Sequence, residues 1–400
     1  MFIIDVLVLA VTCSLVTVNC SSVKSNLQYD HSFDPRAHKN PGKTEYHIDL
    51  DSLIEEALTS ETELRKLYNH YKAKHGVSHG QHETAERLKL FRQYLVRVQE
   101  LKRDDSITWT PGITLMAHMT DCEKSLMTSG NITLDTDDSE EELCGKFKNR
   151  VNKKESNVLQ GSKIPESYDW RAVGAVTPVK EQGESDCWAY AAVTSMEAQI
   201  KYWTGVLLEL STQELVDCVY YGTGPDSWLI GGQPYQAWAY VYKTNRIGYR
   251  AEIPVRAEGG YYSCSYEKWA HNALADNNLR MTPVEFLRRK QATAQNIMFV
   301  VSTTTPVAVL IATQYGDLDK YKGGPFDPRT SKCKPNTKTN HAVVIVGYDK
   351  DYFYIKNSWG DQWGNDGYLW WVRKQGVRDC GIYSRISYHM MAKTKTLKKE

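Results

Sequence analysis

The chain is short of net charge, of phenylalanine and of long hydrophobic runs. Its 49 Lys and Arg residues nearly match its 48 Asp and Glu residues, so the formal net charge is only +1. Such a balance provides no electrostatic attraction to nucleic acid or to anionic membranes. Phenylalanine occurs 8 times, against 25 tyrosines and 11 tryptophans, a bias that suits a wide polar-aromatic cleft. We find no internal repeat, and we expect neither a nucleic-acid partner nor a membrane span.

The overall composition is that of a globular protein. Of the 400 residues, 41% are hydrophobic and 24% are charged. These fractions exclude a mainly disordered, collagenous or polytopic membrane chain. The length suits two or three compact units.

Residues 1–18 form a short apolar run that is interrupted by Asp5 and a few small polar side chains. The run is too short for a comfortable membrane-spanning helix, and small residues follow it where signal peptidase would cut. It lacks the Lys or Arg that usually precedes such a run, so an uncleaved anchor stays as the alternative. We predict a secretory signal over 1–20 and a secreted or lysosomal protein.

The nine cysteines are informative in a secreted chain, because such chains keep disulfides. Cys13 and Cys20 leave with the predicted signal, and seven cysteines remain. An odd number in an oxidising compartment leaves one thiol outside the disulfides. Cys187 is the candidate, since it opens an apolar helical pattern that ends at Gly205.

The rest of the chain divides into two units. In the first, 21–163, two helical patterns at 50–58 and 88–98 indicate a helical domain at about 45–120. The stretch 121–163 is polar, with an acidic run followed by a basic one, which is typical of an exposed, cleavable linker.

The second unit, 164–400, is aromatic and punctuated by glycine. Beyond the helix that follows Cys187, it contains strand-like runs at 306–311, 342–346 and 352–356. It therefore mixes helix and sheet.

Five residues of the second unit indicate nucleophilic catalysis. A helix N-terminus favours the thiolate of Cys187, His341 before a strand can hold the thiol proton, and Asn357 after another strand can orient the imidazole. Gln182 lies five residues before Cys187 and can join the Cys187 N–H in an oxyanion hole. Trp359 can cover the hydrogen bond between the imidazole and the amide.

These residues stand in motifs that resemble those of the papain-like cysteine peptidases. Four segments carry the resemblance, and they are the mature start at 165–180, the nucleophile motif at 187–189, the histidine motif at 340–343 and the asparagine motif at 357–368. They occur in the family's order, and the resemblance covers about 164–388. It implies an α+β fold of two subdomains, a helical one with Cys187 and an antiparallel β-barrel with His341 and Asn357, and places the substrate in the cleft between them.

The same resemblance implies a cysteine endopeptidase that is made as a zymogen. Cys187 would attack as a thiolate, His341 would act as acid and base, and Asn357 would orient it. The resemblance implies protein or peptide substrates, inhibition by the chain's own propeptide and by cystatin-type inhibitors, a monomer, and no metal or organic cofactor. The alternatives are a catalytically weak or silent peptide-binding relative, and a transpeptidase or ligase.

The first unit resembles the mainly helical inhibitory propeptide of the cathepsin L type. Glu83, Arg87 and Phe91 have the i, i+4, i+8 spacing of that family's helix motif, which follows one helical face. The motif then departs at three positions, Tyr94, Val98 and Lys102. A second propeptide motif is preserved only as its first residue in 112–118.

The largest departure from the family lies beside the nucleophile. The loop 182–187 is one residue shorter than the family pattern and lacks its second cysteine, and the element that usually holds the partner cysteine reads 229–232 without one. Asp186 places a carboxylate beside the thiol, which opposes thiolate formation. A shortened loop can also displace Gln182 from the oxyanion hole.

The resemblance implies two disulfides, Cys218 with Cys264 and Cys333 with Cys380. Cys122 and Cys144 then pair with each other or with nothing. Asn131 begins an N-glycosylation sequon. Four histidines, His70, His75, His79 and His82, read as a solvated turn rather than a metal site, with a minor role in propeptide release left open.

The resemblance also implies which residues bind substrate. Gly231 and Gly232, followed by Pro234, would offer backbone hydrogen bonds to an extended peptide, and Trp359 would line the cleft. Arg385 falls at the floor of the pocket for the side chain two residues before the cleaved bond. It predicts a preference for an acidic side chain; the alternative is that Arg385 points to solvent and leucine is preferred.

Overall fold

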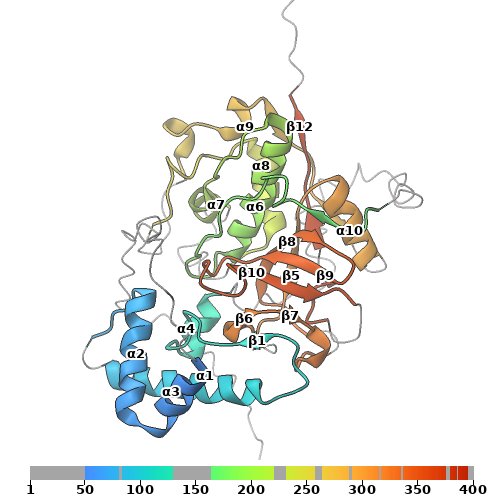
Figure 1. The fold of residues 1–400 in the computed structure, drawn as a ribbon. Coiled ribbons are helices and arrows are strands. Elements are labelled where there is room, and N and C mark those ends of the chain that lie inside the picture. The colour runs from blue at the N-terminus through green and yellow to red at the C-terminus, as the bar shows by residue number, and fades with distance from the viewer. Residues whose placement is uncertain are drawn as a thin grey trace, which may run out of the picture.

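The computed structural model describes residues 50–80, 83–128, 164–219, 231–256, 264–287, 291–314, 317–334, 337–374, 379–384 and 386–394. Figure 1 shows a helical unit from the N-terminal part of the chain, a second group of helices around α6, and a sheet between them. The helices are α1 (Leu50–Thr59), α2 (Glu61–His75), α3 (Thr84–Lys102), α4 (Asp121–Leu126), α6 (Cys187–Thr204), α7 (Thr212–Cys218), α8 (Pro234–Thr244), α9 (Ala273–Asp276) and α10 (Ala294–Thr303), with 3₁₀ turns η6 (Tyr266–Lys268), η8 (Leu318–Lys320) and η9 (Pro328–Thr330).

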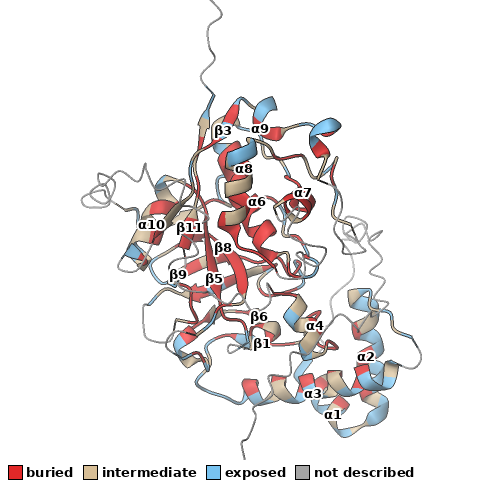
Figure 2. Cartoon of the chain, turned by 180° about the vertical axis from the view of Figure 1, so that it is seen from behind, coloured by how far each residue is buried: buried red, intermediate tan, exposed pale blue. Residues whose placement is uncertain are grey.

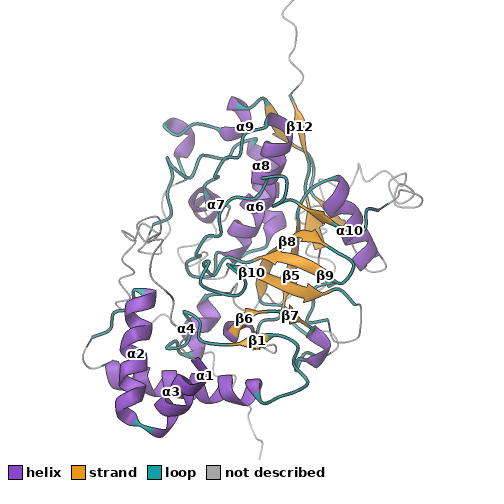
Figure 3. Cartoon of the chain, in the orientation of Figure 1, coloured by secondary structure: helices purple, strands orange, loops and turns teal. Residues whose placement is uncertain are grey.

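The strands are short except in the middle of the sheet, as Figure 3 shows. They are β1 (Thr110–Pro111), β2 (Tyr168–Asp169), β3 (Leu279–Met281), β4 (Glu285–Leu287), β5 (Val307–Ile311), β6 (Tyr321–Gly323), β7 (Pro325–Phe326), β8 (His341–Tyr348), β9 (Tyr352–Lys356), β10 (Tyr368–Val372), β11 (Ile386–Tyr388) and β12 (Met391–Lys393). The three predicted strand-like runs correspond to β5, β8 and β9.

Helices α1, α2 and α3 of the N-terminal helical unit, residues 50–128, have a core of their own, whereas Met119 and Met127 of the same unit belong to the core of the sheet. The predicted patterns at 50–58 and 88–98 form α1 and α3, and their apolar faces meet those of α2 around Tyr68, Phe91 and Leu95. The prediction missed α2, whose sequence is rich in charged residues. Ser60 caps its start by accepting from the Glu63 N–H.

A further helix, α4, lies inside the stretch that was predicted to be a linker. Thr120 and Glu123 form a capping box at its start. The buried Glu123 carboxylate also accepts two hydrogen bonds from the Arg87 guanidinium of α3, one of them 2.6 Å long. Local sequence patterns do not reveal this long-range pair, which joins α4 to α3, so the first residues of the predicted linker are helical rather than extended.

The second unit is built on the packing of α6 against β8. Each α6 residue from Cys187 to Ile200 is buried, because α8 covers one side of the helix and the sheet the other. Strand β8 is buried on both faces, as the red ribbon in Figure 2 shows. Ala342 and Val344 belong to the apolar cluster that contains α6, whereas the alternating residue Val343 belongs to the opposite cluster.

The main sheet has the order β4-β11-β5-β8-β9-β10-β7, and β2 also pairs with β8. The pairs are antiparallel except for β10 with β7, which is parallel. The N-terminal helical unit reaches this part of the molecule through β1, which pairs with β6. The expected α+β fold is confirmed. None of the helices in the described ranges is long and apolar enough to cross a membrane.

A buried cluster of charges holds α6 against the sheet. Glu197 of α6 is completely buried, and its carboxylate accepts from Lys180 Nζ at 2.8 Å and from Thr177 Oγ1 at 2.6 Å. Lys356, at the end of β9, donates in turn to the Thr177 carbonyl at 2.8 Å. Burial lowers the pKa of Lys356 to about 7, against the raising effect of Glu197. Removing one partner would leave a charge buried without compensation.

We therefore expect Glu197→Ala to lower the free energy of unfolding by about 3–5 kcal/mol, because Lys180 loses its closest partner inside the protein. Glu209→Ala is the matched control: Glu209 lies 3.7 Å from Lys180 Nζ and its side chain is 45% exposed, so the loss should stay below about 1 kcal/mol. Calorimetric melting of both variants in a Cys187→Ala background, which removes the predicted nucleophile, measures the difference. Equal losses would contradict this account of the cluster.

Candidate active site

Cys187 lies where α6 meets β8. It is the first residue of α6 and is completely buried. Its Sγ accepts a hydrogen bond from the Ala342 N–H of β8 at 3.4 Å. Of the cysteines in the described ranges, it is the one that belongs to no disulfide, as predicted. A thiol at a helix N-terminus faces the positive end of the helix dipole, which favours its thiolate.

His341 and Asn357 are brought together by the pairing of β8 with β9. His341 begins β8, and Asn357 directly follows β9. His341 Nε2 lies 2.8 Å from Asn357 Oδ1, which also accepts from the Ser358 N–H at 2.8 Å. Because Oδ1 is an acceptor in both contacts, Nε2 carries the hydrogen. Nδ1, which has no hydrogen-bond partner, is then the basic nitrogen of the ring.

Trp359 covers this pair, as the sequence predicted. Its ring stacks on His341 with centroids 4.5 Å apart and an interplanar angle of 23°. His341 is completely buried, and burial lowers the pKa of its imidazole to about 4 although the Asn357 hydrogen bond opposes the shift. In this state the ring is therefore neutral at ordinary pH.

Gln182 is anchored by the segment that follows Asn357. Its backbone N–H donates to the Ser358 carbonyl at 2.7 Å, and its Oε1 accepts from Ser358 Oγ at 2.7 Å. The amide nitrogen Nε2, which is the group expected in the oxyanion hole, then donates to the Gly183 carbonyl at 3.2 Å. Ser358, which holds both Gln182 and Asn357, was not singled out from the sequence, although it stands inside the asparagine motif.

Asp186 occupies the position before α6. Its Oδ2 accepts from the Gly183 N–H at 3.3 Å, and its Oδ1 is buried without a hydrogen-bond partner. Burial raises the pKa of Asp186 to about 7, and the nearby Glu184 adds to the rise. The predicted negative charge beside the thiol is thus present only above that pH.

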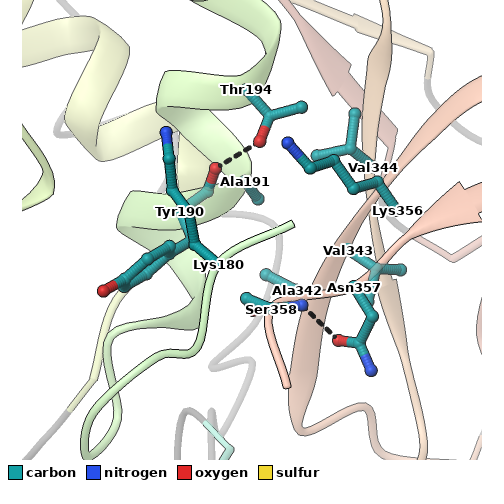
Figure 4. Close-up of a pocket in the computed structure, with 10 residues that line it drawn as sticks. All are labelled: Lys180, Tyr190, Ala191, Thr194, Ala342, Val343, Val344, Lys356, Asn357 and Ser358. Atoms are coloured by element: carbon teal, nitrogen blue, oxygen red, sulfur yellow. Dashed lines mark hydrogen bonds between the residues drawn. The ribbon is translucent and has the colours of Figure 1, made fainter. Parts of the chain in front are cut away.

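A narrow seam separates α6 from the strands behind the candidate residues. It encloses about 10 Å³, room for about one water molecule. Figure 4 shows side chains of α6 on one side and of β8 and β9 on the other. Asn357 and Lys356 both line it, so the buried charge cluster reaches the candidate site directly.

The predicted substrate-binding glycines lie beside the nucleophile. Gly231 has a φ of 73°, which favours glycine. Gly232 packs so closely on Trp188 that a Cβ at this position would lie 2.7 Å from the indole ring. Pro234 follows as the first residue of α8. Arg385 lies outside the described residues, so its pocket assignment stays a prediction.

The N-terminal helical unit covers the site. The Leu126 carbonyl accepts from the Ser185 N–H at 2.6 Å, and the Met127 carbonyl accepts from Trp359 Nε1 at 3.0 Å. Both contacts come from the end of α4, which the sequence did not assign to the helical unit. They close the solvent's access to a site whose nucleophile and imidazole are fully buried.

Two disulfides were predicted from the resemblance, and both are confirmed as Cys218–Cys264 and Cys333–Cys380. Cys122 also belongs to a disulfide, whose partner lies outside the described residues. Asn131, Cys144, the predicted signal and most of the predicted linker lie outside them too. In the described ranges, no group of His, Cys, Asp and Glu side chains is arranged to hold a metal ion.

Comparison with known proteins identifies relatives of both units. A family model described as papain family cysteine protease matches residues 164–390. Papain from Carica papaya is 33% identical over 337 residues, which cover 83% of this chain and 88% of papain. Cathepsin S from Bos taurus is 36% identical over 232 residues, 56% of this chain and 65% of the relative. The proform of the Amb a 11 cysteine protease, a major ragweed pollen allergen, superposes with a TM-score of 0.67 at 26% identity and covers 84% of this chain and 98% of that chain.

The close approach of Gly232 to Trp188 yields a prediction. Gly232→Ala should lower the free energy of unfolding by about 1–3 kcal/mol, because the new methyl group must displace a buried indole. Gly80→Ala is the control, since a Cβ there meets nothing within 4 Å. Thermal melting in the Cys187→Ala background compares the two, and an unchanged melting temperature for Gly232→Ala would show that Trp188 has room to move.

Proposed function

Because the chain belongs to the papain family of cysteine proteases, we propose that it is the zymogen of an endopeptidase whose nucleophile is Cys187. One observation carries the proposal. The 2.8 Å contact between His341 Nε2 and Asn357 Oδ1 leaves Nδ1 as the proton acceptor, and the Cys187 thiol lies against the next residue of the same strand. Thiol, base and orienting amide are therefore assembled from three distant parts of the chain.

The proposed reaction follows from these groups. The Cys187 thiol gives its proton to His341 Nδ1, and Sγ attacks the scissile carbonyl. The amide nitrogen leaves with that proton, which produces a thioester on Cys187. A water molecule, deprotonated by His341, then hydrolyses the thioester and restores the thiol. Gln182 would supply an oxyanion donor through Nε2.

The N-terminal helical unit would act as the inhibitory propeptide. Its Leu126 and Met127 carbonyls bind the Ser185 N–H and the Trp359 indole beside the nucleophile, where they exclude substrate and water. Proform structures such as that of Amb a 11 are similar over both units. We propose that cleavage between the acidic run and Ile164 produces the mature enzyme, and that 164–400 is the catalytic domain. N-terminal sequencing of the acid-treated zymogen tests this boundary.

The remaining features of this proposal rest on the sequence. They are a signal over 1–20, a secreted or lysosomal location, glycosylation at Asn131, a monomeric state and inhibition by cystatin-type inhibitors. Backbone binding of substrate by Gly231 and Gly232, a substrate contact by Pro234 and an acidic preference from Arg385 belong to it as well. Fluorogenic peptides that differ only in Glu or Leu two residues before the cleaved bond test the last point.

A catalytically weak or silent peptide-binding relative is the alternative, and one observation favours it. Gln182 Nε2 donates one of its two hydrogens to the Gly183 carbonyl, which turns the amide toward the loop. Losing an oxyanion donor costs on the order of 10²–10³ in rate. The two functions differ in covalent chemistry, because only a peptidase needs a reactive thiol.

Labelling of Cys187 distinguishes the two functions. After propeptide removal, an epoxide or vinyl-sulfone probe should modify Cys187 at acidic pH, and Cys187→Ala should abolish labelling, peptide hydrolysis and self-processing. Asn357→Ala should be milder, with a loss on the order of 10–100-fold, because it misorients the imidazole without removing it. Normal turnover by Cys187→Ala would refute the assignment of the nucleophile.

The propeptide also contains a group of histidines that acid should disturb. His118 is completely buried and contacts Tyr71 OH through Nδ1, while its Nε2 has no partner. The His79 ring lies 4.9 Å from it. His75 and His79, expected in a solvated turn, are thus partly buried against this group. Burial lowers the pKa of His118 to about 3, and the nearby charges of His79 and Arg87 add to the shift.

We therefore expect acid to loosen the propeptide through His118. A histidine whose folded pKa lies below its unfolded value of about 6.5 contributes stability that is lost as the pH falls below 6.5, by about 2 kcal/mol at pH 5. In the Cys187→Ala zymogen, His118→Asn should make the urea midpoint less sensitive to pH between 7 and 4. His70→Asn, at an exposed site, is the control. If both variants keep the wild-type slope, carboxylates alone cause the acid sensitivity.

A further inference from the structure

In the shortened loop before the nucleophile, the Asp186 side chain forms a hydrogen bond with the backbone of the same loop. Asp186 Oδ2 accepts from the Gly183 N–H at 3.3 Å, and the Gly183 carbonyl accepts from Gln182 Nε2 at 3.2 Å. One chain of hydrogen bonds therefore links the residue before Cys187 to the proposed oxyanion donor. Besides its bonds to Ser358, the Gln182 amide is thus coupled through Gly183 to Asp186.

In the zymogen the loop has a second tether that the mature enzyme loses. Ser185 adopts a left-handed conformation with a φ of 56°, which is unfavourable for a residue with a side chain. Its N–H donates to the Leu126 carbonyl of the propeptide at 2.6 Å. Once the propeptide leaves, this bond is gone, and the contact from Asp186 to Gly183 has to keep the strained turn closed.

We propose that Asp186 is a positioning residue of the peptidase: its carboxyl holds the loop and, through Gly183, the Gln182 amide in place, and its ionisation limits Cys187 reactivity above neutral pH. The proposal rests on the proposed function of Cys187. It reverses the expectation from the sequence that this carboxyl only harms catalysis. The carboxyl is useful when it is neutral, and it opposes the thiolate when it is charged.

The surroundings of Asp186 favour the neutral carboxyl. Among the described residues, no cation lies within ion-pair distance of it. The ionisable groups nearest to it are Glu184 of the same loop, Cys187 and Tyr190 of α6, and His341 of β8. Two further groups act on these neighbours: Glu123 of α4 on Glu184, and Arg250 on Tyr190.

The charge of Asp186 changes near neutral pH. Burial, with Glu184 as a smaller cause, raises the pKa of Asp186 to about 7. Below that pH the carboxyl is neutral and keeps its bond to Gly183 without placing a charge beside the thiol. Above it, a carboxylate adjacent to Cys187 raises the pKa of the thiol, so that at a given pH less thiolate is present than beside a neutral carboxyl.

The test compares Asp186→Asn and Asp186→Ala in the mature enzyme, obtained from the zymogen after propeptide removal. The amide of Asn keeps an oxygen for the Gly183 N–H but cannot ionise, whereas Ala removes the contact. The readouts are the rate of Cys187 modification by an epoxide probe from pH 4.5 to 9, and kcat and KM for a fluorogenic peptide. Glu184→Gln is the control, because it removes a charge from the same loop without removing a hydrogen bond of Asp186.

Above about pH 7, the rate of modification of the wild type should fall behind that of Asp186→Asn, by about tenfold at pH 8.5. Asp186→Asn should keep kcat at pH 5.5 within about threefold. Asp186→Ala should lose about tenfold or more in kcat at pH 5.5 with little change in KM, since a displaced oxyanion donor acts on the transition state. Glu184→Gln should keep the wild-type profile, displaced slightly to lower pH because the charge of Glu184 adds to the raised pKa of Asp186.

Two results would overturn the role of Asp186. They are superimposable pH profiles for the wild type and Asp186→Asn, and a kcat for Asp186→Ala equal to that of the wild type. Neither result touches the proposed function, because the wild type would still be modified at Cys187. Conversely, a wild type that the probe does not modify at any pH would refute the peptidase itself, whatever the variants do.

Discussion

The packing of α6 against β8 is the constraint on which the candidate site depends. Cys187 begins the helix and His341 begins the strand, and the Ala342 N–H donates to the Cys187 Sγ across the contact. Apolar residues of α6 and of one face of β8 form a single cluster. The Glu197 carboxylate adds a buried ionic connection at the same seam. A shift of the helix along the strand would separate thiol and imidazole, so precise packing is a condition for the chemistry.

The same burial that builds the site also keeps it silent in the zymogen. With the propeptide carbonyls of Leu126 and Met127 on the loop and on Trp359, both Cys187 and His341 are removed from solvent. Burial disfavours an imidazolium and a thiolate alike. In the proposed zymogen the propeptide therefore blocks substrate, and the buried imidazole of His341 is held in its neutral form. The departure of the propeptide would restore water, and with it the charged pair that attacks a peptide bond.

The propeptide and the nucleophile loop both depart from the family motifs, and each contains a polar contact that the motifs do not predict. In the propeptide, the second motif retains only its first residue, and Arg87 pairs with the buried Glu123 of α4. In the loop, a residue and a cysteine are missing, and the Asp186 carboxyl accepts from the Gly183 N–H three residues before it.

Much of the fold and of the candidate site was predictable, because helices, strands and catalytic motifs have signals in residues that are neighbours in the sequence. The apolar pattern after Cys187 and the runs at β5, β8 and β9 follow from local patterns, and the family resemblance implied the two disulfide pairs. The direction of the Gln182 amide, the raised pKa of Asp186, the burial of His118 and the assignment of α4 to the helical unit were not predicted. Each of these depends on atoms from distant parts of the chain that desolvate a group or pair with it. Local sequence patterns determine which elements form and which residues carry the chemistry; only the tertiary structure decides how buried and how charged those residues are, since solvation and long-range contacts arise only when the elements pack together.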